Sequence, residues 1–67
     1  MNVLLNDKLT DLPDNILTVK DLVVWKNIPM NGTAIALNDK LIKQNDWESA
    51  VLKENDQLTI ISAAYGG

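Results

Sequence analysis

The sequence predicts an α+β domain in which one main helix covers one face of a mixed sheet of four to five strands. Short apolar runs recur along the chain, and turn-forming residues separate them, as is typical of strands. One segment near Thr18 has helical spacing and a helix-start signal instead. The 67 residues suffice for one small domain, in which a helix and a sheet must bury their apolar surfaces against each other.

The N-terminal segment predicts a β-hairpin. Residues 1–5 form a strand whose odd-numbered side chains share one face. Asn6 and Asp7 both tolerate positive φ and therefore suit a tight turn. Residues 8–12 return as a second, weaker strand, which the turn-forming residues 13–15 bring to an end.

The helix is predicted to span residues 19–26. Thr18 is a good N-cap, and Asp21 stands three residues later in the capping-box position, with aspartate in place of the usual Glu or Gln. Asn27 and Pro29 oppose continuation beyond two turns.

The C-terminal half predicts the remaining strands. Residues 33–38 suit a central strand, residues 41–42 a short one, and residues 57–62 the last. Residues 45–48 look like a single helical turn, with Asp46 as its cap. The first and last strands carry strong inward positions and should pair as neighbours. A helix packed on such a mixed sheet is the β-grasp arrangement.

Alternation and helical spacing also predict which side chains are buried. We interpret Trp25 and Trp47 as packing residues rather than recognition residues. The expected core between helix and sheet consists of Val3, Leu5, Leu22, Val23, Ile35, Leu37, Leu58 and Ile60.

The other face of the predicted sheet stays uncovered, because only one helix is available. By alternation, Leu4, Ala36 and Ile61 fall on this open face. Apolar residues there are either ordinary exposed side chains or a docking patch for partner proteins. We therefore name these three residues as a candidate docking patch.

Composition excludes several classes of function. The chain has no cysteine and no histidine, which removes disulfides, thiolate metal sites, a cysteine nucleophile and the commonest general base. Its net charge of −3 argues against nucleic-acid binding. No signal peptide or segment of transmembrane length is evident, so we expect a cytoplasmic protein without a membrane partner. The carboxylates offer no supported acid–base pair, so we do not expect an enzyme.

The sequence ends in Tyr65, Gly66 and Gly67. Glycine has no Cβ, so this end fits a narrow channel, and an enzyme could activate the last carboxylate with ATP as an acyl-adenylate. We expect residues 1–63 to form the β-grasp domain and residues 64–67 to form a flexible tail.

These features resemble the ubiquitin-like sulfur carriers, and among them most closely the ThiS family of the thiamine pathway. The resemblance covers the whole chain. Asp39 and Asn55 stand where the family usually has glycine, and Tyr65 where it has a smaller residue. The stretches that carry the resemblance are residues 34–38 (Ala-Ile-Ala-Leu-Asn), Trp47, Asn55-Asp56 and Gly66-Gly67.

The resemblance implies a protein cosubstrate that is a monomer when free and binds no cofactor or metal itself. A partner like ubiquitin-activating enzyme, an adenylyltransferase of the ThiF type, would use ATP to adenylate Gly67. A sulfur donor would then convert the terminus to a thiocarboxylate, and a thiazole synthase of the ThiG type would take the sulfur. Tyr65 and Gly66 would thread into the partner sites.

Three alternatives remain at this point. The small subunit of molybdopterin synthase shares the fold, the tail and the chemistry, but its chains are usually longer. A ubiquitin-like modifier would join lysines through Gly67. A β-grasp interaction module without catalysis would carry the two glycines incidentally.

Overall fold

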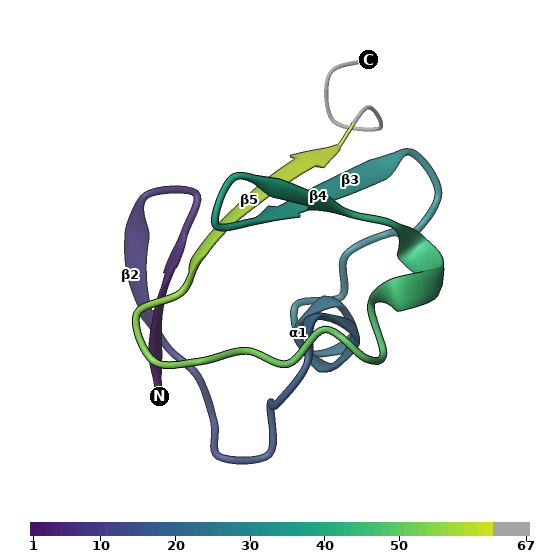
Figure 1. Cartoon of the computed structure of the whole chain (residues 1–67). Helices are drawn as coiled ribbons and strands as arrows, with labels where there is room; N and C mark the ends of the chain where they lie inside the picture. Colours follow the sequence, from purple (N-terminus) through teal and green to yellow (C-terminus); the bar gives the residue numbers. More distant parts are fainter. Residues whose placement is uncertain (63–67) are drawn as a thin grey trace.

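Five strands form one mixed sheet in the order β2-β1-β5-β3-β4, and one helix lies against a single side of it (Figure 1). The computed structural model describes residues 1–62 of the chain, and these elements are those of the described part. The strands are β1 Asn2–Leu5, β2 Lys8–Asp11, β3 Thr33–Leu37, β4 Lys40–Ile42 and β5 Gln57–Ser62, and the helix is α1 Val19–Trp25.

The last strand lies in the middle of the sheet. β5 runs parallel to β1 and antiparallel to β3, while β2 and β4 complete an antiparallel hairpin at each edge. The predicted pairing of the first and last strands is therefore confirmed. The segment between β4 and β5 passes around α1 (Figure 1), where the backbone of Ala50 accepts a hydrogen bond from Val19 N–H at 2.9 Å.

Both ends of α1 follow from local chemistry. The capping box forms as predicted, because the Thr18 hydroxyl accepts from Asp21 N–H and the Asp21 carboxylate accepts from Thr18 N–H, both at 3.1 Å. At the other end Asn27 adopts a left-handed φ of 60°. Ile28 N–H then reaches back to the Val23 carbonyl at 3.0 Å, which is the Schellman pattern. The helix therefore ends one residue before the predicted Lys26, which becomes its C-cap.

The core lies between α1 and the sheet, as predicted. Five of the eight expected core residues are buried, and Leu5, Leu37 and Ile60 are partly buried against them. The complete set of buried apolar side chains in residues 1–62 is Val3, Leu12, Ile16, Val19, Leu22, Val23, Ile35, Trp47, Leu52 and Leu58.

Trp47 is a packing residue, as predicted. Its indole is buried, and Nε1 donates to the Ile42 carbonyl at 3.1 Å. The predicted role of Asp46 as the cap of this turn is wrong. A 3-10 helix spans Gln44–Asp46, its N-cap is Lys43, and the Asp46 carbonyl accepts hydrogen bonds near the end of the turn. The turn starts earlier than predicted, so that Asp46 is its last residue and the buried Trp47 follows directly.

Candidate functional site

The glycine tail is the strongest site prediction, and Tyr65, Gly66 and Gly67 lie outside the described residues 1–62. Their predicted roles stay predictions, as does the domain boundary at residue 63. The structure does describe β5, the strand that precedes them in the sequence. β5 is the central strand of the sheet, and its last residue, Ser62, pairs with Thr33 of β3 beyond the end of β1.

Two asparagines hold β5 from opposite edges. On the β1 side the regular ladder covers only Gln57 and Leu58. Beyond it the Asn6 amide takes over, because its Oδ1 accepts from Ile60 N–H at 2.7 Å and its Nδ2 donates to the Ile60 carbonyl at 3.3 Å. On the β3 side the Asn38 Oδ1 accepts from Gln57 N–H at 2.9 Å. The Asn6 side chain thus extends the pairing of β5 past the end of β1, and the Asn38 side chain extends it past the end of β3.

The same asparagines form the hairpin turns. Asn6 and Asp7 have φ of 48° and 67°, and Asn38 and Asp39 have φ of 51° and 68°. Positive φ at both central residues is the type I′ geometry that suits a two-residue hairpin. Asn55 is left-handed as well, at 70°. At Asp39 and Asn55 the chain therefore replaces an expected glycine with residue types that tolerate the left-handed region.

Replacing Asn6 with alanine should lower the free energy of unfolding by about 1–2 kcal/mol. The change removes both amide bonds to Ile60 and puts a residue with poor left-handed tolerance at φ 48°. Asn6→Gly separates the two effects. Glycine adopts the left-handed φ without strain, so this variant loses only the amide bonds to Ile60. Urea unfolding gives the stability, and hydrogen exchange reports on Ile60 N–H. An Ile60 amide that stays protected in both variants contradicts this role of Asn6.

The open face of the sheet carries the predicted docking residues, but it does not bring all three together. Ala36 and Ile61 are diagonal neighbours, because Ile61 pairs with Ala34 across β3 and β5. Leu4 lies apart from them, since its neighbour on β5 is the polar Gln57. The prediction of one shared face is correct, while the patch is divided into two groups.

Sequence reasoning missed two large, exposed apolar residues of this face. Leu9 pairs with Leu4, and Leu41 pairs with Ala36, so both lie on the open side. Leu41 is 68% exposed and Ile61 61% exposed, and Leu9 is exposed as well. Alternation within the two edge strands was the signal that could have found them. We define the open-face patch as Ala36, Leu41 and Ile61, and Leu4 with Leu9 as its smaller neighbour.

Among residues 1–62 the structure offers little that could support chemistry of its own. No three metal-ligating side chains gather in this part of the chain.

None of the helices in residues 1–62 has both the length and the apolar character needed to cross a membrane. The α-amino group of Met1 lies 3.8 Å from the Asp11 carboxylate, an ion pair at the exposed edge of the sheet.

Comparison with known proteins supplies the context for this site. The sequence matches the model of the ThiS family over residues 3–67. No curated protein matches it. Among solved structures it is similar to the thiamine biosynthesis protein ThiS from Geobacter metallireducens, with 17% identity and a TM-score of 0.83 over 92% of this chain and 93% of that chain. This likeness confirms the β-grasp fold.

Proposed function

The chain belongs to the ThiS family, and from this membership we propose that it is a sulfur carrier of thiamine biosynthesis whose Gly67 carboxylate is adenylated and converted to a thiocarboxylate. The observation that carries the proposal is the family match, which extends through both terminal glycines. Sulfur carried by this chain cannot be held on a thiol of its own, because the sequence contains no cysteine. The terminal carboxylate then becomes the carrying group.

The proposed chemistry takes place in partner enzymes. The Gly67 carboxylate attacks the α-phosphorus of ATP, and pyrophosphate leaves. A donor of a hydrosulfide equivalent then attacks the activated carbon, and AMP leaves, so that one oxygen has been exchanged for sulfur. The chain binds neither ATP nor the sulfur donor by itself. Its part is to present a terminus that no side chain crowds.

The length of the tail limits how far the active site of a partner enzyme can lie from the end of β5. Five residues follow Ser62, and at up to about 3.6 Å per residue they would reach at most roughly 18 Å if fully extended. The reacting carbon must therefore lie within this distance of the end of β5. A partner that binds near β5 satisfies this condition, whereas one that binds at the far end of the domain does not.

We propose that the adenylyltransferase of the ThiF type and the thiazole synthase of the ThiG type both dock on the open-face patch. Ile61 lies next to the last residue of β5, and its exposed side chain belongs to this patch. Leu41 and Ala36 continue the apolar surface across β3 and β4. Burial of these side chains in an interface would favour binding, because it removes apolar surface from water.

Replacing Ile61 with aspartate should weaken binding to both enzymes by about tenfold or more, because the change places a charge in the middle of the apolar contact. Val51→Asp is the matched control, since Val51 is 60% exposed and lies outside the sheet, bridged to Thr18 before α1. Calorimetry with each purified enzyme measures the affinities, and thermal unfolding checks that both variants fold. Unchanged affinity of the Ile61 variant for both enzymes removes the patch from the proposal.

A strain that lacks the gene for this chain tests the pathway. It should fail to grow without thiamine, and supplied thiazole should restore growth. If the chain is instead a molybdopterin-pathway carrier, a lysine modifier or an interaction module, the deletion strain should grow without added thiamine or thiazole. A strain that makes thiamine normally without the chain contradicts the proposed function.

A further inference from the structure

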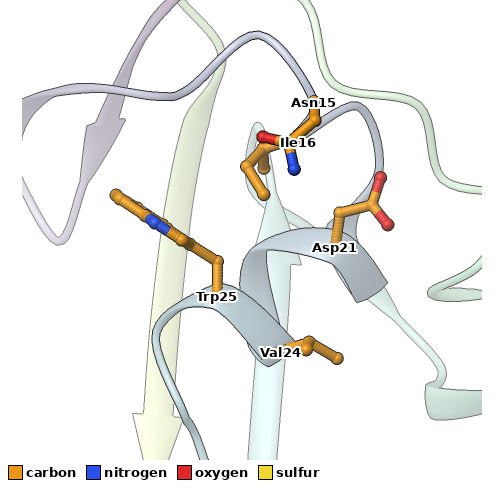
Figure 2. Close-up of a pocket in the computed structure, with 5 residues that line it drawn as sticks. All are labelled: Asn15, Ile16, Asp21, Val24 and Trp25. Carbon is orange, nitrogen blue, oxygen red and sulfur yellow. The ribbon is translucent and has the colours of Figure 1, made fainter.

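A groove of about 280 Å³ lies on the helix side of the domain, away from the open face of the sheet. Helix α1 forms one wall, with Asp21, Val24 and Trp25 on the same helix face because Val24 and Trp25 follow Asp21 by three and four residues. Asn15 and Ile16 form the other wall from the loop before the helix. Figure 2 shows the Trp25 indole and the Asp21 carboxyl on opposite sides, with Asn15 and Ile16 above the helix.

The groove exposes apolar surface that the fold itself does not use. Ile16 in the loop wall is buried, but Val24 is 62% exposed and Trp25 is 41% exposed. The neighbouring Leu17 is also exposed. These side chains lie on the opposite side of the domain from the open-face patch, because α1 covers the inner face of the sheet. A partner could therefore occupy the groove while another contacts the open face.

Within the described part of the chain, the charged side chain that lines the groove is acidic. Asp21 uses Oδ2 for the backbone N–H groups of Leu17 and Thr18, at 3.0 and 3.1 Å. Within residues 1–62 no hydrogen bond occupies its Oδ1. The Leu17 N–H above all, helped by Thr18, holds the pKa of Asp21 below its ordinary value, so the carboxylate is charged at neutral pH.

The aromatic wall is suited to the apolar stem of a partner side chain, because a positive charge of the same chain already lies over the ring. The Nζ of Lys26 lies 5.5 Å from the centroid of the Trp25 ring, so this indole already contacts a positive charge of its own chain. An aromatic face, apolar walls and a carboxylate match a long basic side chain, whose stem is apolar and whose end is charged.

We propose that the groove binds an arginine or lysine side chain of a partner protein. The stem packs on Ile16, Val24 and Trp25, and the charged group donates to the Asp21 carboxylate. The negative net charge of the chain favours such a partner at longer range. The proposal does not depend on the terminal glycines, so it stands or falls separately from the sulfur-carrier function.

A peptide titration followed by NMR tests the groove. The probe is N-acetyl-Leu-Arg-Leu-amide, and the control is the same peptide with citrulline, which has nearly the same shape but no charge. The arginine peptide should shift the Trp25 indole N–H and the Val24 methyl signals and leave Ile61 and Leu41 unchanged. Added salt should weaken the effect, because the contact is an exposed charge pair.

Two variants keep the test independent of folding. Asp21→Asn retains an acceptor oxygen for Leu17 and Thr18 but loses the charge, and it should weaken peptide binding about fivefold or more. Val24→Lys places a competing positive charge at an exposed position of the groove and should also weaken peptide binding. Leu41→Lys is the matched control on the open face, and it should bind as the unmodified chain does. Equal shifts with the citrulline peptide, unchanged binding in both groove variants, or shifts centred on the open face each overturn the proposal.

Discussion

Replacing Leu22 with alanine should lower the free energy of unfolding by about 2–5 kcal/mol. Leu22 is fully buried, at 0% exposure, and lies on the face of α1 that packs on the sheet. The alanine variant loses the transfer free energy of the missing carbons and leaves a cavity that other elements cannot easily fill. A domain of this size is stable by only roughly 3–10 kcal/mol, so the loss threatens the folded state.

Urea unfolding followed by tryptophan fluorescence measures this effect. Val24→Ala is the matched control on the same helix, because Val24 is largely exposed, and its change should stay within about 0.5 kcal/mol. A loss below about 1 kcal/mol for Leu22→Ala would mean that α1 does not provide the central contact of the core.

Removing Gly66 and Gly67 should separate folding from function. The buried apolar residues of the described core all come before the two glycines in the sequence, and the last of them is Leu58. The truncation should therefore change the free energy of unfolding by no more than about 0.5 kcal/mol, as surface changes generally do. Adenylation by the partner enzyme should be abolished, because the reacting carboxylate and its unhindered approach are both gone. Pyrophosphate release with ATP and the purified adenylyltransferase measures the reaction.

Gly67→Ala is the finer version of the same experiment. The variant keeps a terminal carboxylate at the same position but adds a methyl group beside the activated carbon. It should fold normally and react poorly, since the new methyl group would crowd the activated carbon. Normal turnover of the alanine variant would show that the terminal glycine is not required for the chemistry.

The regular elements could be predicted from the sequence because their signals are local. The capping box at Thr18 and Asp21 set the start of α1, and alternation set the faces of β1, β3 and β5. The buried residues that were missed include Leu12, Ile16 and Leu52, which lie outside helices and strands. No periodicity marks such positions, because their burial depends on where the loops cross the core.

The candidate site was predictable to a similar extent. Alternation placed Leu4, Ala36 and Ile61 on one face, but the register that separates Leu4 from the other two is a tertiary property. The capping role of Asp21 follows from its local spacing. Its second role at the rim of a groove depends on the loop that brings Asn15 and Ile16 beside α1, and no local pattern encodes that contact.

Mass spectrometry of the intact chain tests the sulfur-carrier account most directly. After incubation with ATP, a sulfur donor and the adenylyltransferase, the chain should gain the mass that corresponds to exchange of one oxygen for one sulfur. Fragmentation should place the sulfur on Gly67, and the chain without Gly66 and Gly67 should show no gain. Sulfur that maps to another residue, or a truncated chain that still supports thiazole synthesis, would contradict the account.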